Sequence, residues 1–287
     1  MKKILVIGSS VCDVIINIHQ IPQRGEDENI ISQVFQIGGC AFNVASMLHY
    51  FDIPFDLFSP VGKGIYGEFV RDAFVKENIP IMIESQFHNG CCYCLVDESG
   101  ERTFICEHGA EYHFKKEWFD NLDGQDYQYV YICGLEIEEK SGEYIIDFLE
   151  RNPHFQVVFA PSPRLCKIDQ KRMKRIFSLH PIIHLNDDEI CQYTHQTVLE
   201  KAAVDLYAQT KNIIIVTLGE KGCYYYDGKH HYRKGNPIQV VDTIGAGDSH
   251  IGTILAMLYQ NKTLDECIIK ANQIASLVVN QKGARLK

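Results

Sequence analysis

Short apolar runs alternate with longer segments of helical periodicity along most of this chain. The apolar runs are typical of buried strands and fall at Lys3–Gly8, Asp56–Gly62, Tyr129–Gly134, Gln156–Ala160, Ile182–Leu185 and Asn212–Leu218. Helical patterns fall at Ala41–Phe51, Gly67–Glu77, Ser141–Glu150, Thr197–Thr210 and Gly247–Tyr259. Because parallel strands need crossover connections, which are usually helical, the alternation predicts an α/β fold with helices on both faces of a parallel sheet.

Two segments interrupt this alternation. Val14–Ile37 contains two strand-like runs joined by the polar Pro22–Asn29. Ile81–Glu107 contains strand-like Cys91–Val96 and Arg102–Cys106. We expect these segments, about 14–37 and 81–107, to form a small antiparallel sheet that projects from the main body. Such a sheet can act as a lid that excludes water from a site.

Length and composition indicate how many domains the chain forms. With 287 residues, 46% hydrophobic content and no low-complexity tract, the chain is expected to form a single domain over residues 1–287. The apolar run near the start is too short for a signal peptide and is better interpreted as a first strand. No stretch approaches the roughly 18 apolar residues that span a bilayer. The sequence therefore predicts a cytoplasmic protein with no membrane partner.

The eleven cysteines are scattered through the chain, which favours free thiols in a reducing cytosol over a disulfide framework. Cys91, Cys92 and Cys94 are clustered, but they lack a second ligand pair at zinc spacing. Core packing is the better interpretation of this cluster.

The charge balance limits the partners. Twenty-eight basic and thirty-seven acidic residues give a formal charge of −9, which repels a phosphate backbone and removes nucleic acid from the expected partners. A phosphorylated ligand would then be held by local donors, such as backbone N–H groups, and not by the overall field.

The most informative stretch is Val240–Ser249, where an apolar strand end, a turn of small residues and a helical pattern follow one another. The N–H groups of Gly245, Ala246 and Gly247 would point outward at a helix N-terminus, which makes an anion site. Asp248, in the first turn, could accept the proton of an attacking hydroxyl. A tight turn in which Asp248 only stabilises the helix dipole explains the local pattern equally well.

A second glycine pair, Gly38 and Gly39, precedes a helix whose apolar stripe leaves out Asn43. The glycines would let a ligand approach the backbone closely, and the Asn43 amide offers a donor and an acceptor suited to vicinal hydroxyls. A plain turn before a helix is the structural alternative.

Two further motifs follow strand ends, where open α/β sheets bind nucleotides. Thr217, Gly219 and Gly222 allow close backbone approach, although an ordinary β-turn accounts for them as well. Asn186 and Glu189 have the spacing of a capping box, which needs no other function. In the functional alternative, Glu189 organises hydrated Mg²⁺ from its outer shell.

Taken in order, the motifs Gly38-Gly39…Asn43, Asn186…Glu189, Thr217…Gly222 and Asp242…Asp248 resemble the ribokinase-like PfkB family of carbohydrate kinases over essentially the whole chain. The resemblance implies a Rossmann-like three-layer core with a β-lid, the sugar between them and ATP with Mg²⁺ along the C-terminal half. It implies direct in-line phosphorylation of a primary hydroxyl on a small unphosphorylated sugar that is ribose-, fructose- or sugar-acid-like.

The resemblance also assigns roles to individual residues. Asp248 matches the catalytic base, and Gly245, Ala246 and Gly247 match the anion hole. The residues expected to hold substrate are Asp13, Gly38, Gly39, Asn43 and Asp248, and those expected to bind nucleotide are Asn186, Thr217, Gly219, Gly222, Asn272 and Gly283. A monovalent cation such as K⁺ near Asp242 and a homodimer through paired lids are further expectations, the latter because lid edges would be exposed.

Three positions depart from the family pattern. Gly64 and Ala160 stand where many members carry an aspartate, and His250 replaces a phenylalanine. His250 is expected to have a structural role rather than to be a second base.

Other functions remain open at this point. A nucleoside kinase of the same fold and a catalytically silent sugar or nucleotide sensor are the alternatives, since fold alone does not guarantee activity. A dinucleotide-dependent oxidoreductase would need G-x-G-x-x-G after the first strand, where Ser9 and Ser10 stand instead.

Overall fold

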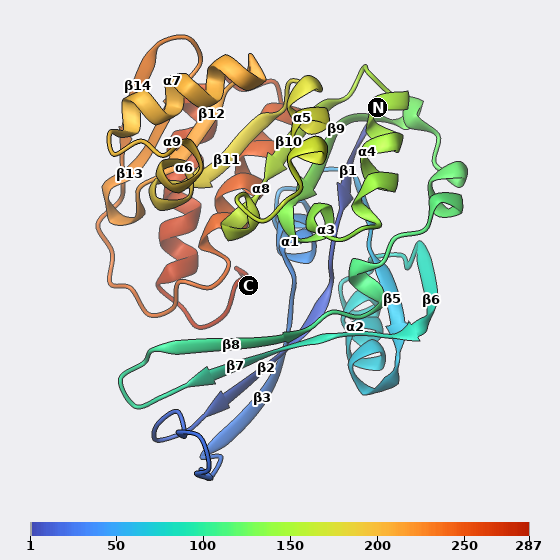
Figure 1. Cartoon of the computed structure of the whole chain (residues 1–287), viewed down its shortest axis with the longest axis vertical. Coiled ribbons are helices and arrows are strands. Elements are labelled where there is room, and N and C mark those ends of the chain that lie inside the picture. Colours follow the sequence, from blue (N-terminus) through green and yellow to red (C-terminus); the bar gives the residue numbers. More distant parts are fainter. Residues whose placement is uncertain (1, 287) are drawn as a thin grey trace.

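The computed structural model describes residues 2–286, so the two ends of the predicted domain, residues 1 and 287, lie outside it. Within this range the main sheet has eight strands (Figure 1). Their spatial order is β14 (His230–Lys234), β13 (Gly222–Tyr226), β12 (Ile214–Thr217), β11 (Ile182–Asn186), β10 (Gln156–Ala160), β9 (Tyr127–Cys133), β1 (Lys3–Ile7) and β4 (Phe55–Phe58). From β12 to β4 neighbouring strands run parallel, and β13 and β14 add an antiparallel hairpin. The α/β prediction is confirmed.

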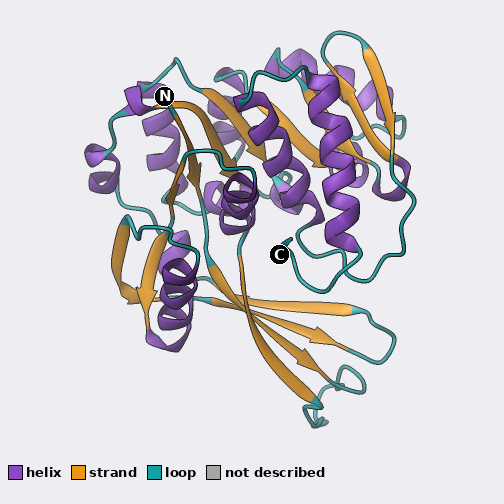
Figure 2. Cartoon of the chain, turned by 180° about the vertical axis from the view of Figure 1, so that it is seen from behind, coloured by secondary structure: helices purple, strands orange, loops and turns teal. Residues whose placement is uncertain are grey.

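Both faces of the sheet are buried, which is why its strands read as continuous apolar runs. In β1, Ile4 and Val6 belong to one hydrophobic core, and Leu5 and Ile7 belong to another. The first core is covered by α1 (Cys40–Tyr50), α8 (Ala246–Tyr259) and α9 (Leu264–Val279). The second is covered by α4 (Gly142–Arg151), α5 (Gln170–Ser178), α6 (Asp187–Thr194) and α7 (Leu199–Thr210), as Figures 1 and 2 show. No helix within residues 2–286 is both long and apolar enough to cross a membrane.

The expected strand Asp56–Gly62 is wrong as a single element. It divides into β4 and β5 (Pro60–Lys63), and β5 pairs with β6 (Ile83–His88) in a separate two-stranded parallel sheet. Pro60 has no N–H group to continue the ladder, so the chain can leave the main sheet at that residue. The predicted helices are present as α1, α2 (Gly64–Lys76), α4, α7 and α8, with ends shifted by a few residues.

The lid is a sheet of four strands in the order β3 (Ser32–Gly38), β2 (Val11–Asn17), β7 (Cys91–Val96) and β8 (Arg102–Glu107). It projects from the body, at the bottom of Figure 1. The outer pairs β2–β3 and β7–β8 are antiparallel as predicted, whereas the central β2–β7 pair is parallel. β6 lies outside the lid sheet, so the lid is shorter than the predicted segment 81–107.

One row of side chains crosses all four lid strands. Asp13 is paired with Gln36 on one side and with Cys92 on the other, and Cys92 is paired with Cys106. Side chains alternate between the faces of a strand, so Arg102 on β8 shares the face of Cys106. Arg102 forms an ion pair with Asp242 of the body at 2.7 Å. The face that carries Asp13 is therefore turned toward the body.

A buried carboxylate joins the lid strands β7 and β8 at their base. Glu111 is fully buried. Its Oε2 accepts a hydrogen bond from Gly90 N–H at 2.9 Å, just before β7, and its Oε1 accepts one from Gly109 N–H at 3.0 Å, just after β8. Burial raises the pKa of Glu111, although these N–H donors act in the opposite direction. The contact fixes where the β7–β8 hairpin leaves the body.

Replacing Glu111 by alanine should destabilise the protein. The change leaves two buried N–H groups without their acceptor, and each such loss costs about 1–3 kcal/mol. We expect the free energy of unfolding, measured by urea denaturation, to fall by about 2–5 kcal/mol. Glu117→Ala, at an exposed position, serves as the matched control. An equal loss in both variants would contradict this account.

Candidate active site

Asp248 lies where the N-terminal ends of two helices meet. It is in the first turn of α8, after the N-cap residue Gly245, and α8 packs against α1. Asn43 in the first turn of α1 donates a hydrogen bond from Nδ2 to Asp248 Oδ2 at 2.8 Å. Burial raises the pKa of Asp248 to about 6, while the side chains of Asn43 and Cys40 oppose the rise. A carboxylate with this pKa can accept a proton near neutral pH.

Asp13 faces Asp248 from the lid. Burial, followed by the negative charges of Cys106 and Asp248, raises the pKa of Asp13 to about 7. The two carboxylates therefore influence each other across the space between the lid and the body. Asn43 adds an unused acceptor, because its buried Oδ1 has no hydrogen-bond partner among residues 2–286. Asp13, Asp248 and Asn43, all predicted from the sequence, are thus brought together.

The glycine pair before α1 is required by close packing. A β-carbon on Gly38 would lie 2.0 Å from Asp13 Oδ2. Gly39 has φ +96°, and a β-carbon there would lie 2.4 Å from the Ser9 carbonyl oxygen. Both positions therefore demand glycine before any ligand is considered. The pair also holds the Asp13 carboxylate against the start of α1.

The small residues before α8 divide into two kinds. Gly245 has φ +73°, and a β-carbon there would meet Ala284, so its conformation and packing explain it. A β-carbon on Gly247 would meet nothing within 4 Å, which leaves open space beside the backbone of the first helical turn. Ala246 N–H donates a long hydrogen bond, 3.3 Å, to Thr243 O. The first N–H groups of a helix lack intrahelical acceptors, so this open space suits an anion.

Two cavities meet at Gly247. The larger, about 400 Å³, contains four of the predicted nucleotide residues in its lining, namely Thr217, Gly219, Gly222 and Asn272. The smaller, about 100 Å³, is lined by Asp248 together with Asn186, Glu189, Thr217 and Ala160. A ligand that extends from one cavity into the other would pass the Gly247 backbone and reach Asp248. Gly283 lines neither cavity.

Asn186 and Glu189 form the capping box that the sequence allowed. Asn186 Oδ1 accepts from Glu189 N–H at 2.8 Å, and Glu189 Oε2 accepts from Asn186 N–H at 2.9 Å. Burial raises the pKa of Glu189. The same carboxylate lines the cavity of Asp248, so capping and a role in the site are compatible. Within residues 2–286 no group of three or more His, Cys, Asp or Glu could hold a metal ion.

Asp242 is held by three donors. Arg102 Nη1 and Ile244 N–H donate to Oδ1 at 2.7 and 2.8 Å, and Gly283 N–H donates to Oδ2 at 3.0 Å. Burial acts to raise the pKa of Asp242, but these donors lower it below its ordinary value. Arg102 therefore supplies a positive charge where the resemblance placed a monovalent cation. Gly283 therefore binds the Asp242 carboxylate through its N–H group, and it lies beside the lid residue Gln36.

His250 takes part in a buried chain of hydrogen bonds. His184 Nε2 lies 2.9 Å from His250 Nδ1, and His250 Nε2 lies 3.1 Å from Asn272 Oδ1. The Asn272 amide nitrogen donates to the carbonyls of Arg233 and Lys234, so its Oδ1 must accept and His250 must donate. Burial lowers the pKa of His250 to about 4. His250 is neutral at pH 7 and supports the wall of the larger cavity, as its expected structural role requires.

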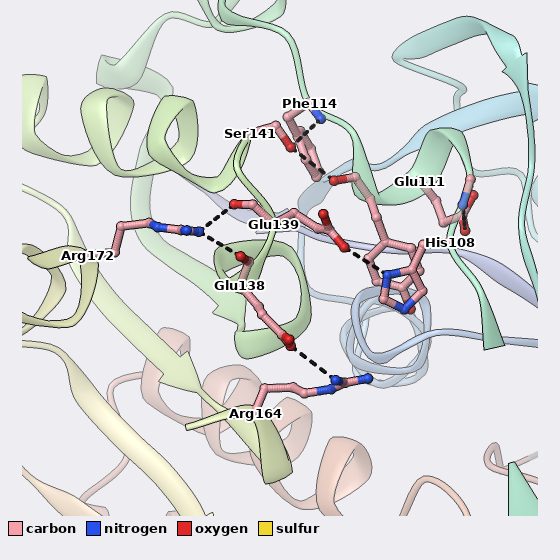
Figure 3. A network of polar contacts seen from close by, with 10 residues as sticks. His108, Glu111, Phe114, Glu138, Glu139, Ser141, Arg164 and Arg172 are labelled. Carbon is pink, nitrogen blue, oxygen red and sulfur yellow. Dashed lines mark hydrogen bonds and ion pairs between the residues drawn. The ribbon is translucent and has the colours of Figure 1, made fainter. Parts of the chain in front are cut away.

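A network of polar contacts that the sequence did not reveal links the segment after β8 to segments of the body (Figure 3). His108 contacts Glu139 at 2.9 Å, and Arg164 pairs with Glu138 at 3.2 Å. Arg172 donates to the carbonyls of the segment that carries both glutamates. No local pattern marks such residues, because the partners are 31 positions apart for His108 and 140 apart for Arg102.

Comparison with known proteins assigns this arrangement to a class. The family model described as pfkB family carbohydrate kinase matches residues 1–287. An uncharacterised sugar kinase of Escherichia coli (strain K12) is 31% identical over 98% of this chain and 90% of its own length. A nucleoside kinase of Thermoplasma acidophilum is 26% identical over 98% of this chain and 90% of its own. Among solved structures, ribokinase from Thermotoga maritima has a TM-score of 0.86 and 22% identity, covering 99% and 95% of the two chains.

The fold is therefore the ribokinase-like α/β fold, with a mixed main sheet and a separate small sheet. The chain belongs to the pfkB family of carbohydrate kinases, and its class is that of phosphotransferases with an alcohol group as acceptor. The resemblance inferred from the four motifs is confirmed. The roles of the individual site residues stay predictions.

Removing the Asn43 amide should raise the pKa of Asp248. A hydrogen bond to a charged group contributes about 1.5–3 kcal/mol, so Asn43→Ala should raise this pKa by roughly one pH unit or more. The measurement is a ¹³C NMR titration of the Asp248 carboxyl carbon, assigned with Asp248→Asn. Ser46→Ala is the control, because the Ser46 hydroxyl bonds the Phe42 carbonyl on the same helix. An unchanged titration in Asn43→Ala would show that burial alone sets the pKa.

Proposed function

We propose that this protein is an ATP-dependent, Mg²⁺-requiring kinase that phosphorylates a primary hydroxyl of a small unphosphorylated sugar. The observation that carries the proposal is the position of Asp248. Its carboxylate is hydrogen-bonded to Asn43, faces Asp13 of the lid and lines a cavity that meets the larger one at Gly247. A hydroxyl held at Asp248 would thus face the end of a nucleotide bound in the larger cavity.

In this mechanism the chain supplies positioning and a base. Asp13 and Asn43 hold the substrate hydroxyls, and Gly38 and Gly39 allow the sugar close to the backbone. Asp248 accepts the proton of the attacking hydroxyl, while N–H groups at Gly245–Gly247 stabilise the charge that develops on the transferred phosphoryl group. No covalent intermediate with the protein is required.

Glu189 and Asn186 would face the hydrated metal. Mg²⁺ usually keeps several waters and binds through one or two carboxylates plus substrate phosphates, which agrees with a site that offers the Glu189 carboxylate and no cage of ligands. When bound, the ion neutralises charge on the phosphates. Solved structures of ribokinase-like proteins include a complex with ADP and a complex with ATP and Mg²⁺, which supports the same choice here.

The charges around the cleft favour an unphosphorylated sugar. Arg102 is paired with Asp242, Arg164 with Glu138 and His108 with Glu139. A phosphate on the substrate would have to displace one of these carboxylates. A ribose-, fructose- or sugar-acid-like compound can instead be held by Asp13 and Asn43 through its hydroxyls.

A nucleoside is the alternative substrate. The second row of the lid on the cleft side is apolar and consists of Val34, Ile15, Cys94 and Phe104, and such a surface could cover a base. The similarity to a nucleoside kinase of Thermoplasma acidophilum points in the same direction. A silent sensor is disfavoured because the proposed base is present with a pKa suited to its task.

Three further expectations belong to the proposal. K⁺ dependence stays a prediction, and Arg102 already places a positive charge at Asp242. A homodimer through the lids is supported by the edge strands β3 and β8 and by exposed apolar residues such as Ile105. The eleven free cysteines fit a reducing cytosol.

Asp248→Asn should abolish most turnover. Loss of a general base costs roughly 10²–10⁴-fold in rate. The test is ADP release with Mg·ATP and a panel of sugars, sugar acids and nucleosides, with ATP binding measured in parallel. Asp72→Asn, at an exposed position on α2, is the control and should keep full activity. Full turnover by Asp248→Asn on the best substrate would remove Asp248 from the mechanism.

The value of kcat/KM should also fall in two steps as the pH is lowered below about 7. The pKa values of Asp13 and Asp248 are raised to about 7 and about 6, and both residues act as ionised groups. A raised carboxyl pKa keeps the proton bound to a higher pH, so the active form is lost as the pH falls through about 7 and then about 6. Since kcat/KM reports on the free enzyme, its profile should be steeper than first order below about pH 6.

Asp13→Asn separates the two steps. This variant should show lower kcat/KM overall and a single acid limb near the pKa of Asp248. A profile of the unmodified enzyme that stays flat between roughly pH 5 and 8 would contradict the assignment of both carboxylates.

A further inference from the structure

Two cysteines lie opposite each other on the face of the lid that is turned toward the body. Cys92 on β7 and Cys106 on β8 are directly paired in the antiparallel register, and their Sγ atoms are 3.3 Å apart. Directly opposed residues of antiparallel strands have Cα atoms about 4.5–5.5 Å apart. A disulfide needs about 4.4–6.8 Å between the Cα atoms and about 2.0 Å between the sulfurs. A small side-chain movement therefore suffices to join the two thiols.

Solvent exposure distinguishes Cys92 and Cys106 from the other lid cysteines. Cys12, Cys91 and Cys94 are buried, whereas Cys106 is exposed and Cys92 is half-buried. The core packing expected for Cys92 from the sequence is therefore wrong, because its register places it in the row of Asp13. Small oxidants can reach Cys106 from the solvent.

Cys106 is also the more acidic thiol of the two. A hydrogen bond with Cys92 and the nearby charges of His108 and Arg164 lower the pKa of Cys106 to about 6, although burial acts against them. The thiolate is the form that reacts with oxidants. Cys92 is then placed to act as the second, resolving thiol, as in proteins that sense oxidants through a pair of cysteines.

We propose that Cys92 and Cys106 form a reversible disulfide across the lid in response to a peroxide. The Cys106 thiolate attacks one peroxide oxygen, the O–O bond breaks, and a sulfenic acid and hydroxide form. The sulfur of Cys92 then attacks the Cys106 sulfur, the S–O bond breaks, and water leaves with the Cys92 proton. Two thiols are oxidised by one hydrogen peroxide, which is reduced to two waters, and a dithiol reductant reverses the change.

The disulfide would act on the site through Asp13. Cys92 is the direct neighbour of Asp13 in the register, and the negative charge of Cys106 is one cause of the raised pKa of Asp13. A disulfide carries no charge, so oxidation should lower the pKa of Asp13. Any effect of this lower pKa on substrate binding rests on the proposed function. The lowering of the Asp13 pKa by oxidation does not.

The linkage can be tested on the whole chain by peptide mass mapping. Trypsin cleaves after Arg102 and so separates Cys106 from Cys92. After treatment with hydrogen peroxide and blocking of the remaining thiols, we expect a linked pair of peptides that dithiothreitol releases. Because Cys91, Cys92 and Cys94 share one peptide, Cys92→Ser should abolish the link and Cys94→Ser should not.

Cys166→Ser provides the control for general reactivity, since Cys166 is exposed and lies outside the lid. This variant should form the link as the unmodified protein does. Oxidation of Cys106 to a sulfinic acid without a link, or a link that survives in Cys92→Ser, would overturn the proposal.

The effect on Asp13 has its own readout. A ¹³C NMR titration of the Asp13 carboxyl, assigned with Asp13→Asn, should move to lower pH in the oxidised protein. Reduced Cys106→Ser should show the same shift, because serine carries no charge, and peroxide should not change it further. An identical titration before and after oxidation would overturn the coupling to Asp13. Failure to find a compound that the protein phosphorylates would count against the proposed function. It would not affect the peptide mapping or the titration of Asp13.

Discussion

The chemistry proposed for this site depends on one half-buried carboxylate, Asp248, held between two helix N-termini. Burial raises the pKa of Asp248, whereas the side chains of Asn43 and Cys40 favour the ion. The balance leaves a pKa of about 6, which suits a base near neutral pH. The glycines before both helices follow from the same requirement, because the chain has to turn sharply and approach this point closely from two directions.

The lid depends on its register in the same way. Side chains alternate along a strand, so a slip of one residue in β2 would turn Asp13 away from the body. Two polar contacts hold the lid at opposite ends: Glu111 binds the base of the β7–β8 hairpin, and Arg102 joins its far end to Asp242. The row from Gln36 through Asp13 to Cys106 is thereby presented to the cleft as a unit.

The sequence predicted those parts of the molecule that local patterns specify. Buried parallel strands and amphipathic helices are marked by periodicity, and the four glycine and asparagine motifs sit at strand ends and helix starts, so most of the cleft residues were found. The β13–β14 hairpin was missed because its polar second strand, His230–Lys234, has no apolar run. The pairs Arg102–Asp242, His184–His250 and Cys92–Cys106 were missed because each depends on how distant segments meet.

The charge distribution explains why the site is built largely from backbone and amide groups. A chain with a formal charge of −9 repels an anionic nucleotide at long range. Arg102 and Arg164 are already engaged with Asp242 and Glu138, and the Arg102–Asp242 pair ties the lid to the body. In the proposed mechanism, phosphate recognition falls to N–H groups at the start of α8, which need no free charge. Because Arg102 ties the lid to the body, a substrate phosphate that drew Arg102 away from Asp242 would weaken this tie, whereas the neutral sugar proposed above would leave it intact.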